Sequence, residues 1–195
     1  MHGLVNRAIE CFLRDTYGAD VWAEIARRAE LRFDSFEAML VYEVELSERV
    51  FAEACTVLGK SREMLAEDLG TYLVSHPNTE ALRRLLRFSG TTYLDFLHSL
   101  DDLPDRARLA VSDLSLPQLE LREDGPGLFR LTLRGGPPGV GHVMVGVLLA
   151  LADDYGTLVL AEHGGRRAGV ETVTLSVHDA DFSAGRSFVL AAERA

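Results

Sequence analysis

The sequence is poor in cysteine and has no long hydrophobic run. Its 195 residues include two cysteines, Cys11 and Cys55, which lie far apart within helix-like patterns. This usage is typical of buried free thiols and not of a disulfide or metal framework. The most apolar stretch, Val140 to Ala152, has 13 residues, whereas a helix that crosses a bilayer needs about 20. Charged residues interrupt the first 20 positions, so we expect no signal peptide and a cytoplasmic protein.

Positive charge is scarce relative to negative charge. Thirty Asp and Glu residues against 20 Lys and Arg residues give a formal net charge of −10 at pH 7. This excess repels phosphate backbones and anionic lipid headgroups. Nucleic acid and membrane surfaces are therefore poor candidate partners.

Motifs of common catalytic and metal sites are also missing. The sequence has no Cys-x-x-Cys, no His-Glu-x-x-His and no lysine-bearing phosphate loop. Gly139 and Gly141 lie between an expected strand and an expected helix, but the third glycine of a dinucleotide-binding loop is absent. No nucleophile can be paired with a base, so we expect a protein that is not an enzyme.

The hydrophobic pattern changes near residue 115. Up to about Leu109, apolar residues recur every three or four positions, which predicts helices. After Pro117, apolar and polar residues alternate, which predicts strands. We expect an α+β fold in a single domain over residues 1–195, with a helical part at about 1–115 and a sheet part at about 116–195.

The sheet part is expected to contain one inserted helix, from about Gly141 to Asp153. The predicted strands cover residues 119–122, 128–133, 157–160 and 170–177, with a last edge strand at 187–190. Turns are predicted at 123–127 and 164–167, where glycine is frequent.

Several short motifs, in a shared order, resemble the H-NOX (haem nitric oxide/oxygen binding) family. Residues 1–6 read Met-His-Gly-Leu-Val-Asn, and Tyr17-Gly18 is followed by Val21-Trp22. These resemble the first two helices of bacterial H-NOX proteins and of the soluble guanylate cyclase sensor domain. Residues 95–103 resemble the run into the haem-anchoring helix, and residues 139–148 a later helix. The similarity covers about residues 1–162.

The resemblance implies a fold and a function. The fold is an N-terminal helical region packed on a C-terminal antiparallel sheet, with a pocket between them. The function is a non-catalytic sensor that binds haem b, detects nitric oxide or another diatomic gas, and regulates a partner such as a histidine kinase or a cyclic-di-GMP enzyme. The apolar residues expected to line the pocket are Val5, Ile9, Leu73, Phe88, Leu97, Leu100, Val143, Met144 and Val147.

Proline stands where the family places the histidine that binds the haem iron. Aligned on Asp101-x-Leu103, that position is Pro104. Proline has no donor atom for iron, and inside a helix it removes a backbone hydrogen bond. We therefore expect the helix to stop near Leu100 and to restart at Pro104, with Asp101 or Asp102 as its cap.

The family motif Tyr-x-Ser-x-Arg, which holds the haem propionates, is also altered. Without gaps its positions fall on Leu133, Gly135 and Pro137, whose side chains cannot bind a carboxylate. A three-residue insertion in the glycine-proline loop would instead place Thr132 and Arg134 at the serine and arginine positions, with Arg130 at the tyrosine position. The alternative for Arg134 is an ordinary surface arginine.

Another histidine could replace the missing iron ligand. His142 begins the helix that borders the pocket in the family, and we predict it as the candidate metal ligand. His98 precedes Pro104 by six positions, about 120° away around a helix, and is expected to be a half-exposed helix residue. Of the other histidines, we expect a structural role for His2, a loop or cap role for His76, and solvent exposure for His163 and His178.

Two hypotheses remain. In the first, haem is retained through apolar contacts and a substitute ligand, and the chain senses nitric oxide or a related gas. In the second, the chain is a divergent member that lacks the family's haem ligation and acts as an apolar-ligand-binding or protein-interaction module. The loss of both motifs favours the second hypothesis, and the extent of the resemblance favours the first.

Overall fold

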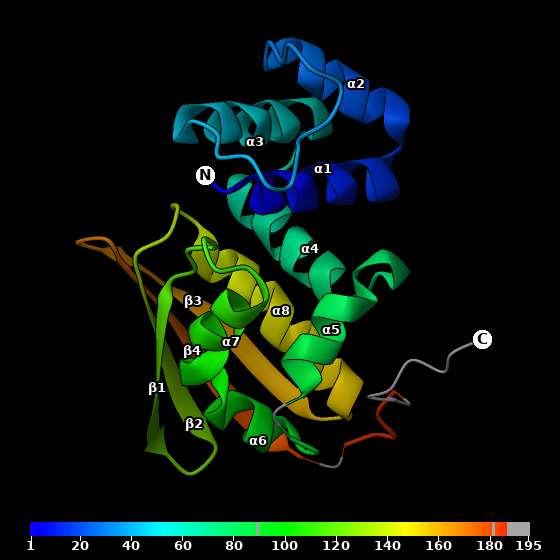
Figure 1. Ribbon diagram of the computed structural model, residues 1–195. Coiled ribbons are helices and arrows are strands. Elements are labelled where there is room, and N and C mark those ends of the chain that lie inside the picture. Colours follow the sequence, from blue (N-terminus) through cyan, green and yellow to red (C-terminus); the bar gives the residue numbers. More distant parts are fainter. Residues whose placement is uncertain (89, 181, 187–195) are drawn as a thin grey trace. The chain divides into compact units, whose positions relative to one another are not determined.

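The structure is a computed structural model that describes residues 1–88, 90–180 and 182–186 (Figure 1). The chain divides into two compact units, an N-terminal unit (Met1–Leu69) and a C-terminal unit (Gly70–Ala195). Helix α4 (Arg62–Ser75) runs through the division. None of the helices described in these ranges combines the length and the apolar character needed to cross a membrane.

The N-terminal unit is helical, as predicted. Besides the first part of α4 it contains α1 (Gly3–Tyr17), α2 (Ala19–Arg28) and α3 (Val44–Leu58). Gly18 has φ 97° and separates α1 from α2, while Gly59 ends α3 in the left-handed conformation, which glycine adopts without strain. The apolar faces of these helices supply the core residues Phe12, Leu13, Ile25, Val50, Ala54 and Leu65.

A buried carboxylate holds the loop between α2 and α3. Glu10 of α1 is fully buried and lies 2.8 Å from an Arg7 nitrogen and 3.1 Å from an Arg14 nitrogen. Its other oxygen accepts hydrogen bonds from the Ser35 hydroxyl at 3.1 Å and from the Phe36 backbone N–H at 2.9 Å. Because a buried carboxylate is stable only when paired and hydrogen-bonded, these contacts fix the loop on α1.

The C-terminal unit contains a four-stranded antiparallel sheet in the order β1-β2-β4-β3. Its strands are β1 (Gln118–Gly125), β2 (Leu128–Arg134), β3 (Leu158–Arg167) and β4 (Val170–Asp179). Its other elements are α5 (Glu80–Arg87), α6 (Tyr93–His98), α7 (Leu103–Ala110), α8 (Val140–Tyr155) and the 3-10 turns η1 (Pro77–Thr79) and η2 (Leu100–Asp102).

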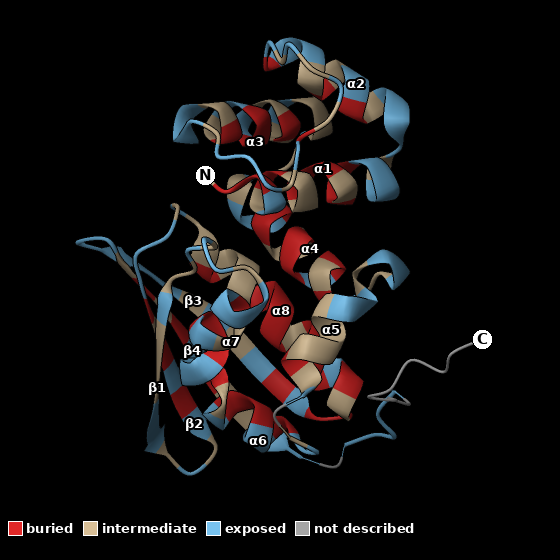
Figure 2. Cartoon of the chain, viewed as in Figure 1, coloured by how far each residue is buried: buried red, intermediate tan, exposed pale blue. Residues whose placement is uncertain are grey.

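Helices α6, α7 and α8 lie on one side of this sheet (Figure 1). Leu131 and Leu133 of β2 and Val173 of β4 are fully buried, and Leu148 of α8 joins them in one apolar cluster. Figure 2 shows the buried residues of the strands and of α8 concentrated in the interior of this unit. The alternation of apolar and polar residues that predicted the strands therefore arises because one face of the sheet packs on the core and the other is exposed to solvent.

The predicted inserted helix, four strands and turn at 123–127 are confirmed. The turn predicted at 164–167 is wrong, because β3 continues to Arg167 and the chain reverses at Ala168 and Gly169, which have φ 50° and 78°. Gly164 and Gly165 instead accommodate an irregularity in the β3–β4 register. The strand predicted at 187–190 lies outside the described residues.

Helix α4 approaches α8 so closely at Gly70 that no side chain fits between them. A Cβ atom on Gly70 would lie 2.0 Å from the Val143 carbonyl oxygen and 2.9 Å from the Val147 backbone nitrogen. We predict that Gly70→Ala lowers the free energy of unfolding by about 1–3 kcal/mol, because backbone atoms must move apart. Urea unfolding of the variant measures this change.

Thr71→Ala is the matched control, since Thr71 is the exposed neighbour on the same helix. It should leave the free energy of unfolding within about 0.5 kcal/mol of the wild-type value. Equal effects of the two substitutions would contradict the close approach at Gly70.

Candidate functional site

The segment that resembles the family's haem-anchoring helix is broken into three parts. Helix α6 begins with a capping box, in which Thr92 and Asp95 each accept a hydrogen bond from the other's backbone N–H at 3.1 Å. It ends at His98, the 3-10 turn η2 follows, and α7 begins at Leu103 with Pro104 in its first turn. The predicted interruption is confirmed, although the first helix ends earlier than predicted.

The cause of the break is the missing N–H of Pro104. A continuous α-helix would require this N–H to bond the carbonyl oxygen of Leu100. Instead the Leu103 N–H donates to that oxygen in the tighter 3-10 pattern. Asp102 occupies the cap position of α7 without a side-chain capping bond. The Asp101 carboxylate accepts from the Leu121 backbone N–H at 2.8 Å, which attaches the segment to β1.

Pro104 lies in an apolar environment. It is buried, as are Leu100, Leu103 and Ala107 on the same segment. None of these side chains carries an atom that can bind iron. His98, predicted to be half-exposed, is exposed, and none of the described histidines of the C-terminal unit falls in the buried class.

A buried tyrosine joins this segment to α8. The Tyr93 hydroxyl donates to the Leu148 carbonyl oxygen at 3.1 Å, and burial raises the pKa of this hydroxyl. The Tyr93 ring also makes an edge contact with the ring of Tyr155, at 6.1 Å between centroids. Because the tyrosine is held at both its ring and its hydroxyl, the start of α6 is fixed on α8.

The residues predicted to line the pocket belong to both units. Ile9, 8% exposed, and the half-buried Val5 are on α1 in the N-terminal unit. The other seven are in the C-terminal unit, where Leu97, Leu100 and Val147 are buried, Leu73, Val143 and Met144 are half-buried, and Phe88 is 71% exposed. The exposure of Phe88, which follows the last turn of α5, does not support its assignment. For the others, lining a common pocket stays a prediction.

Thr132 and Arg134 lie on the face of β2 opposite to the buried Leu131 and Leu133. The Arg134 guanidinium is 3.4 Å from the Glu120 carboxylate. Hydrogen bonds from Arg122 and Arg134 lower the pKa of Glu120, so this carboxylate is charged at neutral pH.

Arg134 and Pro104 line the same surface depression of about 330 Å³. Besides Arg134, the charged residues around it are Arg108, Asp101, Asp105 and Glu120. Because three carboxylates face two guanidiniums, the depression has an excess of negative charge, which disfavours binding of a further carboxylate such as a haem propionate. The negative charge of this depression does not support a propionate-binding role for Thr132 and Arg134, and that role stays a prediction.

His142, the predicted metal ligand, lies in the first turn of α8 beside a second histidine. The rings of His142 and His163 are 4.0 Å apart between centroids, and His163 Nε2 is 3.0 Å from a Glu171 carboxylate oxygen. Among the residues that the structure describes, no three His, Cys, Asp or Glu side chains are grouped so that they could hold a metal ion. The role of His142 as an iron ligand stays a prediction.

Glu171 is a structural residue that the sequence analysis missed. Its two carboxylate oxygens accept hydrogen bonds from the backbone N–H groups of Gly139 at 2.9 Å and Gly141 at 2.8 Å. A Cβ atom on Gly141 would lie 2.6 Å from the same carboxylate. The Gly139-x-Gly141 pattern therefore binds a carboxylate of the chain itself at the N-terminus of α8.

Three of the other histidines have structural partners. His163, predicted to be solvated, is 13% exposed and bound to Glu171, so that prediction is wrong. His2 and His76 are confirmed as N-cap residues, of α1 and η1 respectively, and each accepts a backbone hydrogen bond through Nδ1. His178 is exposed, as predicted.

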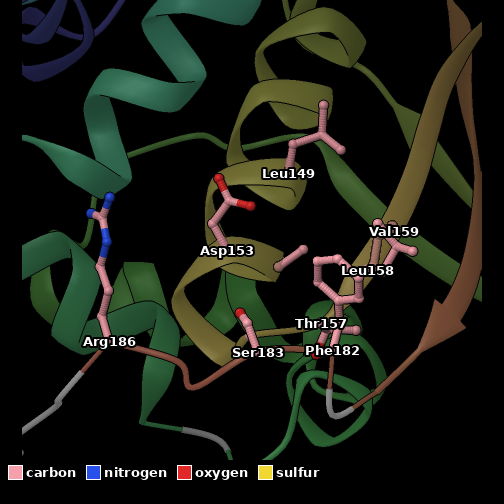
Figure 3. Close-up of a pocket in the computed structure, with 10 residues that line it drawn as sticks. Leu149, Asp153, Thr157, Leu158, Val159, Phe182, Ser183 and Arg186 are labelled. Atoms are coloured by element: carbon pink, nitrogen blue, oxygen red, sulfur yellow. The ribbon is translucent and has the colours of Figure 1, made fainter.

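A second depression, of about 510 Å³, lies where α8 ends and β3 begins, and none of the predicted site residues lines it. Figure 3 shows Asp153 of α8 between the Arg186 side chain on one side and the Phe182 ring on the other. Its lining therefore mixes apolar and charged groups, and it does not match the flat apolar pocket expected for haem.

Comparisons with known proteins decide the family. The Haem-NO-binding family model matches residues 2–163. The chain belongs to the H-NOX family. The resemblance inferred from the sequence is thus confirmed. Domains of this family bind haem and act as sensors, and as domains they are not catalytic.

Individual relatives are distant in sequence. Soluble guanylate cyclase 89Db of Drosophila melanogaster is 19% identical over 155 residues, which are 80% of this chain and 23% of the relative. Soluble guanylate cyclase gcy-31 of Caenorhabditis elegans is 22% identical over 154 residues, or 79% of this chain and 22% of the relative. The chain therefore spans about a quarter of the length of these curated relatives.

Solved structures confirm the α+β H-NOX fold. A mutant H-NOX protein from S. oneidensis in the Fe(II) ligation state has a TM-score of 0.78 at 14% identity, covering 92% of this chain and 97% of that one. A mutant of T. tengcongensis H-NOX has a TM-score of 0.75 at 16% identity, covering 92% and 99%. At these identities the similarity shows the fold.

The donor groups of this chain do not fit the family's haem site. The side chain at position 104 has no lone pair for iron, and the Arg134 guanidinium lies beside carboxylates that oppose a propionate. The fold is thus that of the H-NOX family, and at the position that the sequence motif Asp101-x-Leu103 assigns to the iron ligand the chain carries a proline.

The cap made by Glu171 predicts a pH dependence of stability. Burial would raise the pKa of Glu171, but the hydrogen bonds from Gly139, Gly141 and His163 outweigh it and lower the pKa below its ordinary value of 4.5. A lowered folded-state pKa contributes stability above the unfolded-state pKa, and this contribution is lost as the pH falls through the folded-state pKa.

We predict that Glu171→Gln lowers the free energy of unfolding by about 1–3 kcal/mol at pH 7, and that the difference from wild type shrinks below about pH 4.5. Urea unfolding at several pH values measures both effects. Glu162→Gln, which changes an exposed acid on β3, is the control and should be nearly neutral. If Glu171→Gln lowers the free energy of unfolding by the same amount at every pH, the proposed cap by a charged carboxylate is wrong.

Proposed function

We propose that this chain is a regulatory domain of the H-NOX family that acts on a signalling partner without a histidine-ligated haem iron. The observation that carries the proposal is Pro104, which is buried in the first turn of α7 and which the sequence resemblance aligns with the family's iron-binding histidine. A histidine-ligated iron needs an imidazole nitrogen, and neither Pro104 nor the buried side chains beside it on this segment, Leu100, Leu103 and Ala107, carry a donor atom.

The surrounding structure supports this proposal. Leu97 and Leu100 are completely buried within the cluster that also contains the core residues of the sheet. Asp101 attaches the same segment to β1. The buried side chains of this segment are therefore part of the apolar core, which stabilises the segment without a metal ligand.

Regulation then requires a different input. A ligand or partner shifts a conformational equilibrium only if it binds one state more tightly than the other. We propose that the input is an apolar ligand or direct protein binding, and that the output is received by a signalling protein such as a histidine kinase or a cyclic-di-GMP enzyme. The relatives named as guanylate cyclases, most of whose length lies outside the match, support a link to signalling enzymes.

Haem-dependent gas sensing, including the detection of nitric oxide, is the second candidate. The family match favours it, and it would require a substitute ligand such as His142. The contact of the His142 ring with His163, which is itself bound to Glu171, would have to be given up if His142 turned toward iron.

The two candidates are separated by haem reconstitution. We predict that the wild-type protein, incubated with haem and passed through gel filtration, keeps no sharp Soret band, whereas Pro104→His retains haem with the absorption spectrum of histidine-ligated iron. Pro104→Ala, which allows a continuous helix but supplies no donor, is the matched control and should behave like the wild type.

A stoichiometric Soret band in the wild type would overturn the proposed function. His142→Ala in that background would then test the substitute ligand directly. Loss of the band would assign the iron to His142, and its persistence would assign it to another residue.

A further inference from the structure

The loop between α2 and α3 exposes large apolar side chains. Met39 is 72% exposed, Leu40 is 49% and Val41 is 75%. Val44, at the start of α3, and Leu4, in the first turn of α1, are 46% and 38% exposed. These five residues are named the 39–44 patch below. Clustered apolar exposure of this kind marks binding surfaces, whereas scattered exposed apolar residues do not.

The exposure does not result from a loosely held loop. The Gly3 backbone N–H donates to the Leu40 carbonyl oxygen at 2.6 Å, and the Tyr42 N–H donates to the Met1 carbonyl oxygen at 2.9 Å. His2 and Val41 form a β-bridge. The chain segments approach so closely that a Cβ atom on Gly3 would lie 2.1 Å from the Glu37 carbonyl oxygen.

Side chains fix the loop from its other side. The Tyr42 ring meets the Phe36 ring edge-on, with 4.9 Å between centroids, and the Tyr42 hydroxyl accepts from the Glu37 backbone N–H at 2.9 Å. Phe36 is also bound by Glu10 through its backbone N–H. A partner would therefore meet a preformed surface, which lowers the entropic cost of binding.

The surroundings of the 39–44 patch are acidic. From residue 33 to residue 48 the sequence has five acidic residues and no Lys, Arg or His. Glu37, Glu43 and Glu45 are exposed around the patch, and Glu48 is paired with Arg62. Cations lie at the edges of this stretch: Arg32 and Arg49, both exposed, flank it in the sequence, and the N-terminal amine of Met1 donates to the Tyr42 carbonyl oxygen.

The 39–44 patch has apolar side chains at its centre and glutamates around them, and this combination limits which kind of partner can bind. An anionic lipid surface would be repelled by the glutamates, and a second copy would bring the same acidic rim against itself. An amphipathic helix with an apolar stripe flanked by Lys and Arg would satisfy both parts of the surface. We propose that the 39–44 patch docks a basic amphipathic helix of a partner protein. This inference does not depend on whether haem is bound.

The test uses the full chain and a defined probe. A synthetic amphipathic helix of leucine and lysine, about 15 residues long, is titrated into the isotope-labelled protein and followed by NMR. Backbone signals of residues 39–44 should shift, binding should weaken with added salt, and a leucine–glutamate helix with the same apolar stripe should not bind.

Paired variants separate the apolar and charged contributions. Met39→Ser combined with Val41→Ser should weaken binding of the leucine–lysine helix at least tenfold. Glu43→Gln combined with Glu45→Gln should weaken it several-fold and reduce its salt dependence. Leu160→Ser, which removes a 60% exposed apolar side chain from β3, is the matched control and should bind like the wild type. Circular dichroism establishes that each variant is folded.

Three results would overturn the proposal. The first is unchanged affinity of the Met39/Val41 variant, or an equal loss in the Leu160 control. The second is co-sedimentation of the wild type with anionic vesicles that is abolished by the Met39/Val41 substitutions, which would assign the patch to a membrane. The third is a wild-type dimer that these substitutions dissociate, which would assign it to a second copy.

Discussion

The missing backbone donor of Pro104 determines the course of the chain from Tyr93 to Ala110. Because the Leu100 carbonyl oxygen cannot receive a bond from residue 104, it accepts from Leu103, and the chain makes a 3-10 turn between two short helices. This turn carries Asp101 to the edge of β1, where it accepts the Leu121 N–H. At the position that the sequence resemblance assigns to the iron ligand, this one residue supplies neither a donor atom nor a continuous helix.

The second constraint of the C-terminal unit is the buried carboxylate of Glu171. It joins β4 to the start of α8 and also binds His163 of β3, so three elements meet at one charged group. The sequence analysis assigned the glycines before α8 to a weak nucleotide-loop pattern, although an acidic residue at a core-facing position of a strand was the available signal. Because the groups that bind Glu171 are separated from it in the sequence, its role as a cap of α8 could not be predicted without the fold.

Local patterns predicted most of the secondary structure, and tertiary contacts account for what they missed. The alternation in β1, β2 and β4 and the proline in α7 act over a few residues, and both were interpreted correctly. The β3–β4 turn was misplaced because two glycines indicated a reversal, whereas the register with β4 extends the strand to Arg167. For the candidate site, the proline at position 104 and the surface-arginine alternative for Arg134 could be read from the sequence, but the His163–Glu171 contact could not, because it depends on the pairing of β3 with β4.

The proline also limits how this domain can transmit a signal. A helix that moves as one rigid body under the pull of iron requires an unbroken hydrogen-bond ladder, and Pro104 prevents that ladder in every conformation in which it occupies a helix interior. The segment is also held by Leu100 in the core and by Asp101 on β1. This segment is therefore not a single helix that could move as one rigid body. The loop between α2 and α3 is fixed on α1 yet exposes apolar side chains between glutamates, and it is the surface at which we propose that a partner docks.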